Sequence, residues 1–140
     1  MLAKDRTDKR KARHQECQED FTPDSVLEIL CDVDDKLFTD FSKTFLDPCA
    51  GNGNIYIFVL KKRLYHCTEA EEIYSAIETM YGTELMQDNV DEFKERVLEI
   101  LNNYELNRDR VLSILNHNIV CTDTFKWDYE NWKPIDNALF

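Results

Sequence analysis

The chain has 140 residues, a size that suits one domain, and 43% of them are hydrophobic, which is enough to form a core and excludes a wholly disordered protein. The sequence contains no apolar run long enough to cross a membrane, and the charged residues from Lys4 onward are not typical of a signal peptide. We therefore expect a cytoplasmic protein without membrane contact, whose thiols stay reduced.

Charge is unevenly placed along the chain, whose formal net charge is −11. Residues 1–13 hold six basic and two acidic side chains, so this arm has a net charge of +4 and the rest carries −15. A body this acidic should be repelled by phosphates, so nucleic acid is expected to be reached only through a partner protein. We interpret residues 1–19 as a basic, polar, solvated tail and residues 20–140 as the folded domain. The alternative is that the arm touches nucleic acid or an acidic partner.

The cysteines give no indication of a metal site or of a disulfide framework. There are five of them, an odd number, and no two are spaced as a CxxC pair. His14 with Cys17 and His117 with Cys121 imitate the spacing of zinc ligands. Structural zinc sites usually show tighter and repeated pairs, so we expect no metal.

The first elements are predicted in the N-terminal half of the chain. Pro23 and Asp24 are typical of a helix start, and the apolar residues that follow share one helical face: Val26, Leu27 and Leu30. Residues 44–47 form a short β-prone run, and residues 48–54 have the composition of a turn. Residues 55–64 predict a buried helix, although their β-branched content leaves a strand as the alternative.

The second half continues the alternation of helices and short strands. In chain order we expect a helix over residues 69–80, a strand over 81–85, a helix that is capped by Asp88 or Asn89 and ends at about Tyr104, a helix over 108–115 and a strand over 119–121. After Asp123 the chain becomes rich in aromatic residues and is expected to be irregular. Short strands that alternate with helices predict an α/β fold, in which helices cover a parallel sheet of about three strands.

Three polar features fall at the ends of the predicted strands. Asp47 and a Gly51-x-Gly53 turn follow the first strand, Glu84 lies at the end of the second, and Asp123 follows the third. Glycines let the backbone turn sharply beside a ligand, and an acidic residue after a strand can accept hydrogen bonds from ribose hydroxyls. Ligands of open α/β sheets bind beyond these carboxyl ends. Taken alone, the glycines also fit an ordinary tight turn between a strand and a helix.

The same residues resemble motifs of S-adenosylmethionine-dependent adenine DNA methyltransferases. Residues 47–54 (Asp-Pro-Cys-Ala-Gly-Asn-Gly-Asn) are similar to the first motif of that family, and Phe21-Thr22-Pro23 resembles its Phe-x-Pro motif. Residues 81–85 followed by Asp88 and Asn89 resemble the second motif, and residues 118–125 resemble the third. The resemblance covers about residues 19–135 and departs from the family at Ile55, where an aromatic residue is common.

The resemblance implies a Rossmann-like methyltransferase fold and a site for S-adenosylmethionine. Phe21, Thr22 and Pro23 would pack near the methionine end of the cofactor, Glu84 would hold its ribose, and Asp123 would meet its adenine amine. The cofactor-binding residues that it implies are Phe21, Thr22, Pro23, Asp47, Pro48, Gly51, Gly53, Glu84, Asp123, Thr124 and Phe125.

One motif of the family has no counterpart in the sequence. The family clamps its target nitrogen with an Asp/Asn/Ser-Pro-Pro-aromatic motif, on which the flipped base stacks. The three prolines here, Pro23, Pro48 and Pro134, are not adjacent, and the nearest approach is residues 137–140, Asn-Ala-Leu-Phe. We therefore expect a truncated methyltransferase-like chain that carries no catalytic residue and does not methylate DNA by itself.

The family's strand order is 3-2-1-4, so a chain without the fourth strand would leave the first strand at an edge. An apolar edge strand presents unpaired backbone groups, so we expect the C-terminal aromatic residues, a second copy of the chain or a partner protein to cover it.

The alternative functions are a non-catalytic module that binds a protein, such as an acidic inhibitor of a nucleic-acid enzyme, and an inactive fragment or decayed gene product.

Overall fold

A computed structural model of the chain describes residues 35–136, and these form an α/β fold around a parallel sheet. The sheet consists of β1 (Phe45–Asp47), β2 (Met80–Glu84) and β3 (Ile119–Cys121), in the order β1-β2-β3. All its pairs are parallel, with Asp47 opposite Gly82 and Glu84 opposite Cys121. The three predicted strands are thereby confirmed. The helix expected from Pro23 and the boundary at residue 19 lie outside the described residues.

The helices of the described part agree with the predicted alternation. They are α3 (Lys36–Thr39), α4 (Asn54–Tyr65), α5 (Ala70–Glu78), α6 (Gln87–Leu101) and α7 (Arg108–Asn118). The strand alternative for residues 55–64 is wrong, because this segment forms α4 and buries residues at helical spacing, among them Tyr56, Leu60 and Leu64. The short α3 was not predicted. No helix among residues 35–136 has both the length and the apolar character that crossing a membrane requires.

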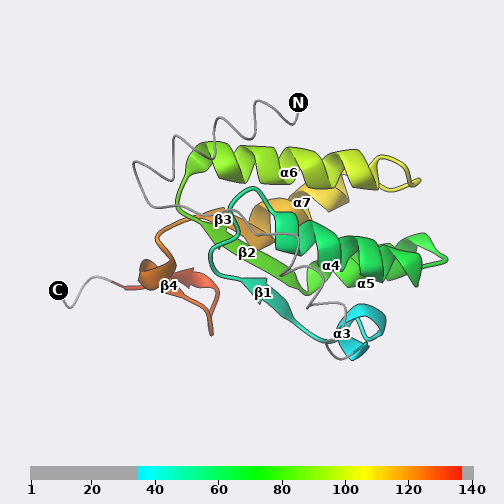
Figure 1. Cartoon of the computed structure of the whole chain (residues 1–140), viewed down its shortest axis with the longest axis horizontal. Coiled ribbons are helices and arrows are strands. Elements are labelled where there is room, and N and C mark those ends of the chain that lie inside the picture. The colour runs from blue at the N-terminus through cyan, green and yellow to red at the C-terminus, as the bar shows by residue number, and fades with distance from the viewer. Residues whose placement is uncertain (1–34, 137–140) are drawn as a thin grey trace.

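The two faces of the sheet are covered differently, as Figure 1 shows. Helices α4 to α7 lie on one side, where Gly82 of β2 packs against the buried ring of Phe93 on α6. Side chains of neighbouring strand residues point to opposite faces. Tyr81 accordingly contacts the other side, where its ring lies 4.7 Å from that of Trp132, centre to centre.

The segment after Asp123 is more ordered than the sequence predicts. It forms a 3-10 turn, η1 (Thr124–Lys126), and an antiparallel hairpin of β4 (Trp127–Asp128) and β5 (Lys133–Pro134). The carboxylate of Asp128 accepts hydrogen bonds from the backbone of Glu130 and Asn131, which stabilises the turn. Trp132, which has a positive φ of 53°, anchors the hairpin because its Nε1 donates to the His117 carbonyl at 2.7 Å. The expectation of irregular structure is therefore wrong for this segment.

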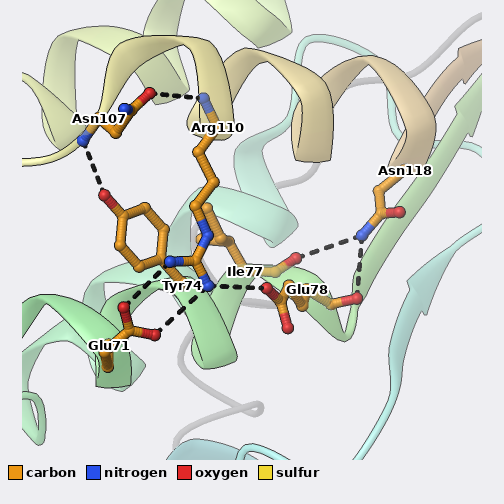
Figure 2. A network of polar contacts seen from close by, with 7 residues as sticks. All are labelled: Glu71, Tyr74, Ile77, Glu78, Asn107, Arg110 and Asn118. Atoms are coloured by element: carbon orange, nitrogen blue, oxygen red, sulfur yellow. Dashed lines mark hydrogen bonds and ion pairs between the residues drawn. The ribbon is translucent and has the colours of Figure 1, made fainter.

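A polar network joins α5 to α7 within the helical layer (Figure 2). The guanidinium of Arg110 stacks 3.8 Å from the centre of the Tyr74 ring and donates to both carboxylate oxygens of Glu71. The Tyr74 hydroxyl accepts from the backbone nitrogen of Asn107, whose side chain caps α7. Asn118, at the other end of α7, donates to the carbonyls of Ile77 and Glu78. The two helices are thus fixed to each other at both ends of α7.

A buried arginine connects α4 to the segments that lead into β1 and β2. Arg63 is 0% exposed, and its guanidinium donates to the carbonyls of Leu37, Lys43 and Ala76 and to the Thr79 hydroxyl over 2.6–2.9 Å. Burial lowers its pKa. Because several nitrogens of the guanidinium have a protein acceptor, hydrogen bonds to neutral groups compensate much of the burial of this cation.

Candidate functional site

The polar residues predicted at the strand ends gather at the carboxyl edge of the sheet. Asp47 ends β1, Glu84 ends β2, and Asp123 lies two residues beyond β3. The backbone nitrogen of Thr122 donates to the Glu84 carbonyl at 2.9 Å, which continues the ladder between the two strands toward Asp123. The edge at which ligands of open α/β sheets bind is therefore formed by these three segments.

The loop after β1 depends on its two glycines. Gly51 has a φ of 57° and Gly53 a φ of 91°, values in the left-handed region that residues with a Cβ rarely adopt. A Cβ on Gly53 would lie 2.6 Å from Cδ1 of Phe93, so space as well as conformation requires glycine there. The chain enters α4 directly after Gly53, and no side chain caps this helix end. The first turn of α4 thus offers backbone N–H groups at the strand edge.

Glu84 binds the glycine loop directly. Its Oε1 accepts from the backbone nitrogen of Gly51 at 3.2 Å, and its Oε2 accepts from that of Met86 at 2.8 Å. Only 8% of the residue is exposed. The structure therefore brings together two of the predicted site residues, which are 33 positions apart in the sequence.

The start of α6 is organised around the same carboxylate. The helix begins at Gln87 with Met86 at the cap position, so the predicted caps Asp88 and Asn89 are wrong. Asn89 is buried inside the helix, and its Nδ2 lies 3.3 Å from Oε2 of Glu84. An Asn near a helix start is an ordinary cap signal, and nothing in the residue pattern indicates that this one faces the acidic residue.

Asp47 is buried beside the loop. Its Oδ1 accepts from the backbone nitrogen of Cys49 at 3.1 Å. Burial raises the pKa of Asp47, that hydrogen bond opposes the rise, and the negative charge of Glu84 adds to it. Two carboxyl groups thus share the edge of the sheet, and the edge favours a ligand that donates hydrogen bonds to them.

Asp123 shapes the third loop. Its Oδ1 accepts from the backbone nitrogen of Phe125 at 2.9 Å and so caps η1. Phe125 is 87% exposed, and Leu85, directly after Glu84, is 62% exposed. Two large apolar side chains therefore stand in solvent next to the two acidic residues. Such surface suits an aromatic ligand ring.

The contribution of Arg96 to the site could not be predicted from the residue pattern. This residue of α6 donates through Nη1 to the carbonyl of Asn52 at 2.9 Å and to Oδ1 of Asn54 at 2.8 Å. It thereby attaches the glycine loop and the start of α4 to α6. In the sequence it belongs to a charged helical face, where an arginine is usually solvated.

His117 and Cys121, whose spacing imitates that of zinc ligands, form other contacts in the structure. Among residues 35–136, no group of three or more His, Cys, Asp or Glu side chains is arranged to hold a metal ion. His117 contacts the side chain of Asn118 through Nδ1, and the Cys121 thiol donates to the Leu85 carbonyl. The predicted cofactor residues Phe21, Thr22 and Pro23 lie outside the described residues, as do His14 and Cys17.

Comparison of the chain with protein-family models, with curated proteins and with solved structures gives no match.

Proposed function

We propose that the chain binds S-adenosylmethionine at the carboxyl edge of its sheet, in a Rossmann-like methyltransferase arrangement. The observation that carries this proposal is the direct contact between Glu84 and the backbone of Gly51. An acidic residue at the end of the second strand and a glycine loop at the end of the first are the two parts from which nucleoside sites of such sheets are built.

The donors and acceptors at the edge fit the groups of this cofactor. Glu84 would accept from the ribose hydroxyls, and Asp123 would accept from the adenine amine. The exposed side chains of Leu85 and Phe125 offer apolar surface to the adenine ring. The uncapped first turn of α4 offers N–H groups to the negatively charged carboxylate of the methionine part.

Catalysis requires parts that these residues do not supply. Bound S-adenosylmethionine provides an electrophilic methyl group, but the target base also needs a polar clamp and an aromatic surface. The sequence contains no pair of adjacent prolines that would match the family's clamp. We therefore infer that residues 1–140 do not methylate DNA by themselves.

The position of β1 supports association with another chain. Among residues 35–136, β1 is an edge strand of the three-stranded sheet, and its Leu46 is 38% exposed. An edge strand presents unpaired backbone groups to which a further strand can add. A homo-oligomer and a complex with a different protein both fit this edge.

A module that binds a protein without any cofactor is the second candidate function. The internal hydrogen bonds of Glu84 favour it, because they stabilise the loop without a ligand.

Calorimetric titration with S-adenosylmethionine tests the proposal. We expect saturable binding that weakens about 10- to 100-fold in Glu84→Gln, since a hydrogen bond to a charged group contributes about 1.5–3 kcal/mol. Glu95→Gln is the matched control, because Glu95 is exposed on α6. An unfolding curve of each variant checks that the fold is retained.

A cofactor analogue without the ribose 2′ and 3′ hydroxyls locates the contact. The wild type should bind it more weakly than S-adenosylmethionine, whereas Glu84→Gln should bind the two ligands nearly equally. If the wild type and Glu84→Gln lose the same affinity when the hydroxyls are removed, Glu84 does not bind the ribose hydroxyls. No binding by the wild type would refute the cofactor site and favour the protein-binding module.

A further inference from the structure

We propose that Tyr129, on the turn of the β4–β5 hairpin, is a positioning residue that holds the loops of the cofactor site in register. The inference rests on the proposed function for its ligand, and it concerns a residue that lies outside every motif of the sequence. Its support comes from the hydroxyl contacts of Tyr129, from the way the hairpin is attached to the sheet, and from the residues that these contacts reach.

The hydroxyl of Tyr129 joins β2 to the segment that follows β3. It donates to the Thr124 carbonyl at 2.9 Å, and it lies 2.5 Å from Oγ1 of Thr124 and 3.1 Å from Oγ1 of Thr83. Thr83 directly precedes Glu84, and Thr124 directly follows Asp123. One phenol oxygen therefore contacts the neighbours of both acidic residues that the cofactor would meet.

Thr83 extends the connection to the loop after β1. It is fully buried, its hydroxyl donates to the Pro48 carbonyl at 2.8 Å, and its own carbonyl accepts from the backbone nitrogen of Ala50 at 2.9 Å. The Thr124 side chain lowers the pKa of the Cys49 thiol in this loop, which opposes the rise that burial causes. The residues that lead into Gly51 are thus held by Thr83 at both Pro48 and Ala50.

The three hydroxyl groups form a closed network. Tyr129, Thr83 and Thr124 have one hydroxyl proton each, and the network has four contacts. The Thr83 proton is donated to the Pro48 carbonyl and the Thr124 proton to the Tyr129 oxygen, so the Tyr129 proton is shared between the Thr124 carbonyl and Oγ1 of Thr83. Each proton therefore has an acceptor within the network. Removal of one hydroxyl therefore changes the hydrogen bonds of the other two, because the groups of such a network are coupled.

The hairpin that carries Tyr129 is attached firmly enough to act as a support. Trp132 packs against Tyr81 of β2 and donates to the His117 carbonyl of α7, and its ring lies 6.2 Å from that of Tyr129. The backbone nitrogen of Ile135 donates to the Lys126 carbonyl at 3.0 Å, which returns the end of the hairpin to η1. The hydroxyl of Tyr129 is consequently presented from a braced element on the face opposite α6.

Tyr129→Phe tests the inference because it removes the hydroxyl and keeps the ring that packs on Trp132. We expect S-adenosylmethionine to bind about tenfold more weakly, the effect of about 1.4 kcal/mol, with little change in the midpoint of urea unfolding. Tyr65→Phe is the control, since that side chain is exposed at the far end of α4. Thr83→Val combined with Tyr129→Phe should weaken binding by less than the sum of the single effects.

Amide hydrogen exchange of the ligand-free protein separates this inference from the proposed function. In Tyr129→Phe, the amides of Ala50, Gly51 and Phe125 should exchange about tenfold faster than in the wild type, while the amide of Leu60 on α4 should not change. Unchanged exchange at the loop amides of Tyr129→Phe overturns the positioning role. If the wild type binds the cofactor, an equal affinity in Tyr129→Phe overturns it as well. If the wild type binds no cofactor, the proposed function fails and the exchange rates alone decide the role of Tyr129.

Discussion

Replacing Gly53 by alanine should destabilise the fold, and the structure separates the loss into two parts. Gly53 has a φ of 91°, and the left-handed conformation costs a residue with a Cβ about 1–2 kcal/mol. The new Cβ would also lie 2.6 Å from Cδ1 of Phe93, and such overpacking typically costs about 1–3 kcal/mol. The lower entropy of the unfolded alanine chain returns about 0.4–1 kcal/mol. We expect a net loss of about 2–4 kcal/mol.

Gly82→Ala is the matched comparison, because it adds a methyl group near the same ring without the unfavourable φ. Its Cβ would lie 3.0 Å from Cε2 of Phe93, a contact that a small shift of the ring relieves. We expect this variant to lose about 1 kcal/mol, at the lower end of overpacking costs. The difference between the two alanine variants then reports the backbone strain at Gly53 together with its closer contact.

Urea unfolding followed by the fluorescence of Trp127 and Trp132 and by circular dichroism measures these losses. A cycle with Phe93→Leu isolates the contact: in that background Gly53→Ala should cost only the backbone part, about 1–2 kcal/mol. If Gly53→Ala costs the same in both backgrounds, the Phe93 contact contributes nothing. A loss below about 1 kcal/mol in the wild-type background would refute the assignment of strain to this glycine.

Two further predictions concern buried charges. Arg63→Lys should destabilise the fold by about 3–5 kcal/mol, because an ammonium cannot serve the acceptors of the guanidinium and buried carbonyls lose partners; a urea midpoint no lower than that of the exposed control Arg108→Lys would contradict this. Asp47→Asn should be more stable than the wild type at pH 7, because a pKa raised on folding means that the ionised carboxylate opposes the fold. This stability advantage of Asp47→Asn should shrink as the pH falls through the raised pKa of Asp47, and it should vanish below the pKa of the unfolded chain, about 3.9. Unfolding curves of both proteins between pH 3 and 7 measure the difference. An Asp47→Asn variant that is less stable than the wild type at pH 7 would show that burial is not the dominant effect.

The strand positions could be predicted because their signals are local. A β-prone run before Gly51 and Gly53 predicts a strand, a turn and a helix, and the apolar spacing of the later segments predicts α6 and α7. The segment that became α4 was ambiguous, since its β-branched and apolar residues suit a buried strand as well. Its conformation follows from burial of residues at helical spacing along α4, which no single strand face would provide.

Several contacts of the site could not be predicted because they join residues far apart in the chain. Arg96 binds the backbone of Asn52 across 44 positions, and Tyr129 lies 46 positions from Thr83. In the sequence, Arg96 belongs to a charged helical face and Tyr129 to an aromatic segment expected to be irregular. Neither residue type indicates a partner, since Arg and Tyr side chains contact many kinds of groups.

The alternation of strands and helices, the glycine turn and the acidic residues at the strand ends follow from local residue preferences, because each depends on propensities within a few positions. The contact between Glu84 and the backbone of Gly51, the burial of Arg63 and the position of the Tyr129 hairpin opposite α6 arise only when the elements pack together. The physical reason is that hydrogen bonds and burial depend on distances in space, which the packing of helices on a parallel sheet sets after the local elements are chosen.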